Sequence, residues 1–451
     1  MQSPVRFTFP AFALAAVLGV FSLFGGLAVP AASAAPQPSP DAAMQSYKDL
    51  HHGLFFHYIY IGRQLYYRSA KIPDACWEGG KAVANLDELA DNLDIPDLVK
   101  LCETARAQYV IFTVFHANIN VLYPSKVMAK WLPGHTSKRD VIGELARALK
   151  EKGIRVILYF HPSDAHDLGK EDQARLDVSG FNSGGAGGRT PQNTARWNDF
   201  TNELLTEILE RYGKHIDGFF IDGGLPRYVD AARLRRTIKS ANPGLWIIQN
   251  AGLRRECADF AFNENTFKTP FPVTTWMRGA VISGDWRALK DGRVKTPIDA
   301  ACRYLVLQAA VAQQLGGGVS WSFGPYPGGK WEPGVRDFAK DIGAFAAKVG
   351  DSVFNTRPST AWVTRNNQPL LGTKHAALDS KDGTKTYLHV FLPPEGKTLR
   401  LPAPANKKQF RIAKLFADGT AVAISQDANG VSLTLPDSAK WDPLDTIFTL
   451  E

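Results

Sequence analysis

The feature that most constrains this 451-residue chain is a regular alternation of short apolar runs with longer amphipathic stretches, from residue 53 to about residue 350. Short runs rich in β-branched and aromatic residues predict buried strands, and the stretches between them have the spacing of surface helices. Strands that alternate with helices form a parallel sheet with helices outside it. Eight such runs are present, which is the number that closes a (β/α)8 barrel.

The expected strands cover residues 53–58, 108–114, 154–160, 216–222, 245–250, 259–263, 274–282 and 318–323. The expected helices cover residues 95–106, 140–151, 196–212, 231–240, 297–315 and 333–348. We therefore predict an α/β fold in which residues 44–352 form a catalytic β/α barrel.

After residues 356–358 the pattern changes to short alternating runs separated by turn residues, which predicts an antiparallel β-sandwich over residues 356–451. Asp418-Gly419 and Asn429-Gly430 are dipeptides typical of tight hairpin turns. The expected strands cover residues 361–363, 386–391, 398–401, 410–415, 431–435 and 446–450.

The first 34 residues have the features of a secretory signal peptide. Residues 11–29 are almost wholly apolar, and Ala32-Ser33-Ala34 offers a cleavage site. An uncleaved membrane anchor is the alternative, because the apolar run is about as long as a bilayer requires. We expect residues 35–43 to be a disordered lead-in, and the processed protein to be secreted or periplasmic with no membrane attachment.

Composition argues against two functional classes. The net charge is +8 and the basic residues are scattered, so binding to nucleic acid is not predicted. Cys76, Cys102, Cys257 and Cys302 lack CxxC spacing, which argues against a zinc site. An oxidising compartment would allow one or two disulfides among these cysteines, which can be paired in three ways. The sequence does not determine the oligomeric state.

A carboxylate follows the fourth expected strand. Residues 216–221 are mostly apolar and end on Asp222, which two glycines follow. A strand that carries an acid at its carboxyl end is how a barrel enzyme presents a catalytic group. The alternative is a loop aspartate that caps the next helix. Glu264 follows the sixth strand, and hydrolysis of a glycosidic bond requires such a pair of carboxyl groups.

Polar and aromatic side chains are also carried by the other strands or follow them. They are His57, Tyr58, His116, Asn118, Tyr159, His161, Arg254, Trp276 and Trp321. Aromatic faces together with hydroxyl-binding groups suit an uncharged sugar, and no glycine-rich phosphate loop follows a strand. A metal site built from these histidines and Asp222 is the rival interpretation, but HExxH or H-x-H spacing is absent among them. We expect neither a metal nor a cofactor.

Several segments, in order, resemble motifs of the alpha-L-fucosidases of glycoside hydrolase family 29. Residues 53–57 resemble GxFxHWG, residues 220–223 resemble WFDG, and residues 316–329, with Gly324-Pro325, resemble GGNLLLNxGPxxDG. The resemblance covers nearly all of residues 50–451. It implies a retaining exo-glycosidase that removes terminal α-linked L-fucose, or a related sugar, from oligosaccharides or polysaccharides. It assigns the nucleophile to Asp222, while Glu264 is the expected acid/base and Glu256 its competitor.

The chain also departs from this family. The family's KHHDGF becomes residues 114–119, so Phe115 replaces a sugar-binding histidine, and HWG becomes His57-Tyr58-Ile59. A hydroxyl that faces Phe115 would lose its partner. We therefore expect weak activity on simple α-L-fucosides. The alternatives are a glycosidase for a different deoxy- or hexose sugar, and a non-catalytic carbohydrate-binding protein.

Overall fold

The computed structural model describes most of the chain after residue 38. The described residues are 39–60, 83–116, 119–163, 165, 168–178, 194–223, 225, 228–250, 252–254, 256–265, 277–283, 285–286, 288, 292–312, 318–362 and 374–451. Contacts divide the chain into Met1–Gln37 and Pro38–Glu451, and all described residues belong to the second unit. The expected signal peptide, Cys76, Asn118 and Trp276 lie outside the described residues. Among the residues described, no helix has the length and apolar character needed to span a membrane.

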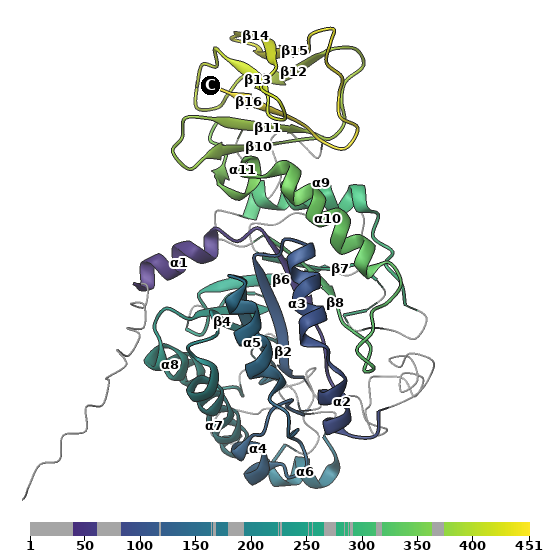
Figure 1. The fold of residues 1–451 in the computed structure, drawn as a ribbon. Coiled ribbons are helices and arrows are strands. Elements are labelled where there is room, and N and C mark those ends of the chain that lie inside the picture. Colours follow the sequence, from purple (N-terminus) through teal and green to yellow (C-terminus); the bar gives the residue numbers. More distant parts are fainter. Residues whose placement is uncertain are drawn as a thin grey trace, which may run out of the picture. The chain divides into compact units, whose positions relative to one another are not determined.

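Eight parallel strands close into a barrel in their sequence order (Figure 1). They are β1 (His52–Phe56), β2 (Tyr109–Phe115), β3 (Arg155–Phe160), β4 (Gly218–Ile221), β5 (Trp246–Asn250), β6 (Phe260–Asn265), β7 (Met277–Val281) and β8 (Val319–Phe323). β1 and β8 close the ring, with His52 opposite Val319. The predicted barrel and all eight of its strands are confirmed.

Helices lie outside the strands, and all six expected helices are present. The helices of the barrel region are α1 (Pro40–Lys48), α2 (Leu86–Asn92), α3 (Ile95–Thr104), α4 (Lys126–Trp131), α5 (Val141–Glu151), α6 (Lys170–Arg175), α7 (Ala195–Tyr212), α8 (Ala231–Ala241), α9 (Ile298–Ala312), α10 (Val335–Val349) and α11 (Asp351–Phe354). Asp94, Asp140 and Asp230 cap α3, α5 and α8 by accepting a backbone N–H of the first turn. The described part of the β5–β6 connection contains no helix.

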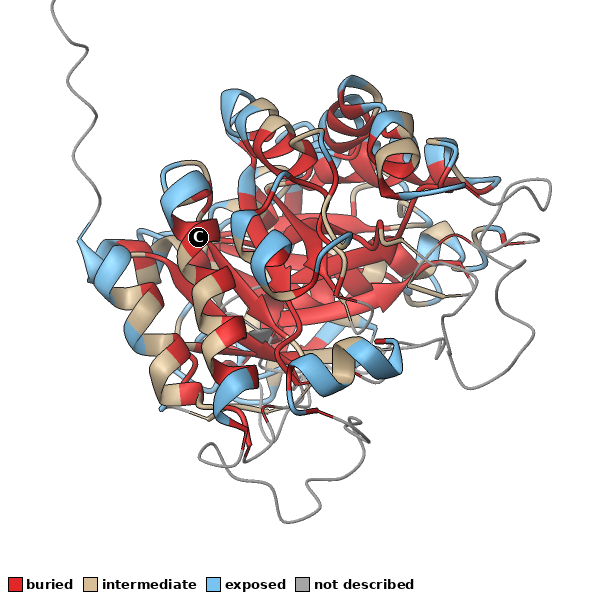
Figure 2. Ribbon diagram, turned by 90° about the horizontal axis from the view of Figure 1, so that it is seen from below, coloured by how far each residue is buried: buried red, intermediate tan, exposed pale blue. Residues whose placement is uncertain are grey.

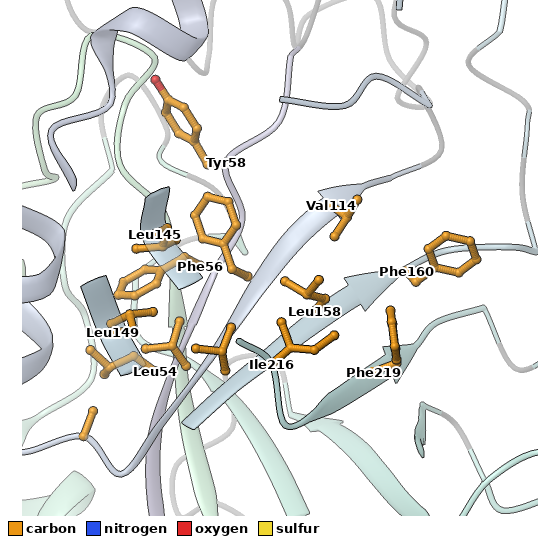
Figure 3. Close-up of a cluster of buried hydrophobic side chains, with 14 of the residues drawn as sticks. Leu54, Phe56, Tyr58, Val114, Leu145, Leu149, Leu158, Phe160, Ile216 and Phe219 are labelled. Atoms are coloured by element: carbon orange, nitrogen blue, oxygen red, sulfur yellow. The ribbon is translucent and has the colours of Figure 1, made fainter. Parts of the chain in front are cut away.

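The barrel strands are buried on both faces, while the helices expose their outer sides (Figure 2). Alternate residues of each strand point inward and outward. Phe55, Tyr159, Phe220, Ile248 and Phe262 belong to one cluster inside the barrel. Outward-facing residues join a larger cluster beneath the helices, which includes Leu54, Phe56, Val114 and Leu158 of the strands and Leu145 and Leu149 of α5 (Figure 3). This alternation decides which strand residues can reach the site.

Helix α1 closes the end of the barrel where the strands begin. The Tyr47 ring stacks on Phe260 at 3.7 Å between centroids and meets Trp246 edge-on at 5.5 Å. The Trp246 indole N–H donates to the Ala43 carbonyl at 2.8 Å. Residues 40–43 are therefore helical, which corrects the expected lead-in of residues 35–43. The helix forms there because Ser39 caps it and it covers an apolar barrel floor.

The C-terminal region is an antiparallel sheet with strand order β12-β15-β14-β13-β16-β11-β10-β9. Its strands are β9 (Thr356–Pro358), β10 (His375–Ser380), β11 (Thr386–Val390), β12 (Thr398–Pro402), β13 (Ala413–Leu415), β14 (Ala421–Asp427), β15 (Gly430–Thr434) and β16 (Thr446–Leu450). The antiparallel domain is confirmed. The expected strand at 361–363 is wrong where it is described, because residues 361–362 form a bend, and β9, β10 and β14 were not predicted.

The strand β14 joins the two halves of this domain. Ala421 and Val422 pair with β13, whereas Ala423 to Asp427 pair with β15. A strand that changes partners along its length turns one sheet over another. Side chains from both halves then share one apolar core, which includes Leu388 and Phe448 on one side and Leu401 and Leu433 on the other.

Candidate active site

The carboxyl end of β4 presents Asp222 to the mouth of the barrel. Its backbone N–H still follows the strand ladder, donating to the Phe160 carbonyl at 3.0 Å. The chain then turns at Gly223, which has φ of 84°. A Cβ at this glycine would lie 2.4 Å from the Ser163 Cβ. Glycine is therefore required here both for its backbone conformation and for space.

Four groups surround the Asp222 carboxylate. Oδ1 accepts from the Gly223 backbone N–H and from the Asn250 Nδ2, each at 2.7 Å. Oδ2 accepts a short hydrogen bond from the Tyr159 hydroxyl, and the His161 Nε2 lies 3.8 Å from the same oxygen. The strands β3, β4 and β5 are neighbours in the barrel, which is why these side chains meet.

The second carboxyl group, Glu264, is tied to the first through Asn250. The Asn250 Nδ2 donates to the Glu264 Oε1 at 2.5 Å and to the Asp222 Oδ1 at 2.7 Å. Glu264 comes from β6, the next strand of the barrel, and is exposed at the mouth. The structure therefore brings together the two carboxyl groups expected from the sequence.

The surroundings of the two carboxyl groups separate their acidities. Burial alone would raise the pKa of Asp222, yet the His161 ring and the hydrogen bonds hold that pKa below its usual value. Glu264 has exposed surface, but the protein around its carboxyl group limits hydration. This partial desolvation and then the negative charge of Asp222 raise the pKa of Glu264 to about 7, and the Asn250 hydrogen bond lowers it in part. At neutral pH one group is ionised and the other retains its proton for much of the time.

Imidazole and aromatic rings line the site beside Asp222. His116 stacks on Tyr159 at 5.6 Å and on His161 at 5.1 Å between ring centroids. His57 lies 5.9 Å from the His116 ring and 5.6 Å from the Trp286 ring. His57, Tyr159 and His161 are buried, whereas His116 and Trp286 are partly open. The imidazole nitrogens can hydrogen-bond a ligand, and the aromatic faces can pack against its C–H groups.

Two expected site residues point away from the mouth. The Tyr58 hydroxyl donates to the carbonyls of Leu89 and Pro327, at 2.8 and 3.2 Å, and the side chain belongs to the outer core (Figure 3). Trp321 is fully buried between Tyr304 and Phe338 of the outer helices. His57 faces the interior, so its neighbour Tyr58 cannot. The geometry therefore corrects the expectation of sugar contacts for both residues.

Phe115 also lies outside the site. Its ring packs edge-on against Phe160 at 4.7 Å, within the outer core. The pairing of β2 with β3 shifts between Thr113 and Phe115, which places this ring beneath the helices. Phe115 therefore does not face a sugar hydroxyl, contrary to the expectation from the sequence, although it supplies no imidazole either.

Arg254 and Glu256 form a separate pair. The Arg254 guanidinium donates to the Glu256 carboxylate at 2.7 Å and to the Leu225 carbonyl at 2.6 Å. Its described contacts are therefore with these groups and not with Asp222 or Glu264. The backbone N–H of Glu256, and then Arg254, lower the pKa of Glu256. An acid whose pKa is lowered is a poor proton donor at neutral pH, which favours Glu264 over Glu256 as the acid.

Within the described residues, no group of three or more His, Cys, Asp and Glu side chains is arranged to hold a metal ion. The histidines instead face one another as rings. Cys102, Cys257 and Cys302 are buried free thiols.

Two residues of the site were not assigned a role from the sequence. Asn250 is the last residue of β5, and it follows Trp246 and Ile248 at the two-residue period of the interior face. That period was the signal that could have identified it. Trp286 lies after β7 in a connection with no regular pattern, and no feature of the sequence distinguishes it from the other tryptophans.

Comparisons with known proteins agree with this architecture. A family model described as alpha-L-fucosidase matches residues 17–351. Solved alpha-L-fucosidases share the fold. A Bacteroides thetaiotaomicron enzyme of glycoside hydrolase family 29 has a TM-score of 0.65 and 22% identity, covering 93% of this chain and 98% of that chain. A Paenibacillus thiaminolyticus isoenzyme has a TM-score of 0.66 and 19% identity, covering 92% and 99%.

A Thermotoga maritima alpha-fucosidase has a TM-score of 0.64 and 15% identity, covering 90% of this chain and 96% of that chain. At these identities the structures demonstrate a shared fold. No curated protein matches the chain.

Proposed function

Since this chain belongs to the alpha-L-fucosidase family and is a glycoside hydrolase acting on carbohydrate, we propose that it is a retaining exo-glycosidase for terminal α-linked L-fucose or a related sugar. Its substrates would be oligosaccharides or polysaccharides outside the cytoplasm. Asp222 serves as the nucleophile and Glu264 as the acid/base.

The observation that carries this proposal is the short distance between the two carboxyl groups, which one nitrogen atom links by hydrogen bonds. Because one Asn250 nitrogen bonds both, the Asp222 Oδ1 and the Glu264 Oε1 are separated by no more than the sum of bonds of 2.7 and 2.5 Å. Retaining glycosidases hold their carboxyl groups about 5–5.5 Å apart, whereas inverting enzymes need about 6.5–9.5 Å for a water. The spacing supports retention.

The separated acidities support the same division of roles. In the first step a carboxylate oxygen of Asp222 bonds to the anomeric carbon, while the glycosidic C–O bond breaks and its electron pair stays on the departing oxygen. Glu264 gives that oxygen its proton. In the second step Glu264 takes a proton from water, the water oxygen bonds to the anomeric carbon, and the bond to Asp222 breaks, which restores the carboxylate.

A related enzyme provides a precedent for the covalent step. The Bacteroides thetaiotaomicron fucosidase was crystallised as a trapped covalent intermediate with 2-fluoro-fucosyl fluoride, using a glutamate-to-glutamine mutant. In this chain the lowered pKa of Asp222 keeps the nucleophile ionised, and the raised pKa of Glu264 keeps the acid protonated. A non-catalytic sugar-binding protein would have no need for this separation.

The sugar is proposed from the lining of the site. His57, His116 and His161 can hydrogen-bond hydroxyls, and the partly open Trp286 ring can cover a C–H face. None of these groups is a cation opposed to a phosphate, which supports an uncharged sugar. Export is proposed from the apolar run at residues 11–29 and the cleavage site at Ala32-Ser33-Ala34.

The test uses a panel of aryl glycosides comprising the α-L-fucoside, the α-L-rhamnoside, and the α- and β-galactosides. Hydrolysis of one sugar, with a product that first appears by NMR in the same anomeric configuration as the substrate, would support retention. A 2-fluoro derivative of that sugar should then label Asp222, as located by peptide mass spectrometry. An inverted product, or a label on another residue, would overturn the assignment, and no hydrolysis of any α-linked member would count against the activity.

A further inference from the structure

Asn250 joins the two carboxyl groups of the site through one nitrogen atom. An amide NH2 has two hydrogens, and each points to one carboxyl oxygen here, at 2.7 Å for Asp222 and 2.5 Å for Glu264. Asn250 is buried, with 5% of the residue's surface exposed. Because the ionised Asp222 carboxylate can only accept, the NH2 group and not the carbonyl oxygen of Asn250 must face it.

Within each of the two carboxyl groups, Asp222 and Glu264, the hydrogen bonds distinguish one oxygen from the other. The Asp222 Oδ1 accepts from both Asn250 and the Gly223 backbone N–H, so its two acceptor positions are occupied. The Asp222 Oδ2 accepts from Tyr159 and keeps a second position. In the same way, Asn250 holds the Glu264 Oε1, which places the transferable proton on Oε2. The Asn250 amide thus holds one oxygen of each carboxyl group, and the other oxygen of each can react with the substrate.

From this geometry we propose that Asn250 is the positioning residue of the reaction, holding both carboxyl groups at the spacing of retention and directing Asp222 Oδ2 and Glu264 Oε2 to the substrate. The proposal rests on the roles proposed above for Asp222 and Glu264. Asn250 itself transfers no proton and forms no covalent bond.

The position of Asn250 in the barrel explains why one residue can serve both groups. It ends β5, which lies between β4, the strand before Asp222, and β6, the strand that carries Glu264. The floor beneath it is filled by Trp246 and Ile248 of the same strand. Adjacent strands lie about 4.8 Å apart, so a short side chain on the middle strand reaches both neighbours.

Loss of the amide should change the acidities as well as the rate. The Asn250 hydrogen bond lowers the pKa of Asp222 and the pKa of Glu264, because a donated hydrogen favours the ionised form of each. Without this donor, Asp222 requires a higher pH to ionise. An asparagine that only ended β5 would not alter the pH dependence.

The experiment compares Asn250→Ala and Asn250→Asp with the wild type in the full chain. Asn250→Asp keeps the size of the side chain but places a third carboxyl group where the donor was. We expect kcat/KM on the best aryl glycoside to fall on the order of 10²-fold or more in both variants. We also expect the acidic limb of the kcat/KM profile to move to higher pH in Asn250→Ala.

Asn242→Ala is the matched control. Asn242 lies before β5, at the opposite end of the same strand, where its Oδ1 accepts the Gly244 backbone N–H at 2.9 Å. This variant should keep the wild-type rate and pH profile. A shifted profile in Asn242→Ala, or an unshifted acidic limb in a folded Asn250→Ala, would overturn the positioning role.

A measurement independent of turnover separates this proposal from the proposed function. Side-chain carboxyl groups labelled with ¹³C can be titrated by NMR, with the Asp222 signal assigned through Asp222→Asn. A higher pKa of Asp222 in Asn250→Ala would support the positioning role even if the wild type hydrolysed no glycoside of the panel. An unchanged pKa would count against Asn250 while leaving the hydrolase assignment intact. If the alanine variant does not fold, Asn250→Leu, which removes the donor without adding a charge and keeps a side chain of similar size, provides the same comparison.

Discussion

The two ends of the barrel are built from the same eight strands but have opposite chemistry. At the end where the strands begin, α1 seals the interior with Tyr47 against Phe260 and Trp246. At the other end, Asp222 and Glu264 are held close together around Asn250. The closed end gains stability from burial of apolar surface, whereas the mouth keeps two mutually repelling carboxyl groups close together. Substitutions at the two ends should therefore affect different properties.

The largest effect is expected from Asp222→Asn. The amide cannot attack the anomeric carbon, so kcat should fall by about 10⁴- to 10⁶-fold. The midpoint of thermal unfolding should fall only modestly, because the lowered pKa of Asp222 means that the folded site stabilises its carboxylate, while the amide keeps the size of the side chain. Enzyme kinetics and a thermal melt check both parts. Residual activity within about tenfold of the wild type would exclude Asp222 as the nucleophile.

Glu264→Gln should have the next largest effect, with a loss of about 10²- to 10⁴-fold in kcat/KM. In the wild type Glu264 donates a proton, and its pKa is about 7, so kcat/KM should decline as the pH rises through about 7. That alkaline limb should disappear in the variant. A dinitrophenyl glycoside, whose leaving group needs little protonation, should lose less activity in kcat/KM than a poorer leaving group. Equal losses for both would argue against an acid role.

At the closed end, Tyr47→Ala should lower the free energy of unfolding by about 3–5 kcal/mol, because it removes a fully buried ring. The variant should retain the wild-type kcat at a temperature where it remains folded. Tyr47→Phe is the control. The Tyr47 hydroxyl is buried and has no hydrogen-bond partner in the described structure, so its removal should leave stability equal or slightly higher. Urea unfolding measures both variants. A change in kcat in either would contradict the separation of the two ends.

The smallest effect concerns sugar specificity. When a buried sugar hydroxyl loses its imidazole partner, the binding free energy becomes less favourable by about 1–3 kcal/mol. Simple aryl α-L-fucosides should therefore be cleaved with kcat/KM below about 10⁴ M⁻¹s⁻¹. Phe115→His should not restore activity, because residue 115 packs against Phe160 in the core, and the variant should instead be less stable. Efficient cleavage by the wild type would mean that another residue supplies the contact.

Much of this architecture could be predicted from local patterns. Strands and helices of the barrel were evident because their apolar periods differ and because turn residues separate them. Asp222 could be identified because a single buried strand ends on it, and Glu264 because it follows another strand. Where the local signal was weak, the prediction failed. β10 and β14 have short, mixed patterns, and α1 is helical because it covers the barrel floor and not because its own sequence is strongly amphipathic.

The sequence by itself determined the order of the elements, the strand ends that carry polar groups, and the candidate nucleophile, because each depends on residues close together in the chain. Only the tertiary structure decided which of two neighbouring strand residues faces inward, and so removed Tyr58 and Trp321 from the site. It also brought Asp222, Asn250 and Glu264 together. Their proximity depends on the side-by-side pairing of β4, β5 and β6, and pairing between distant segments has no local signature in a single chain.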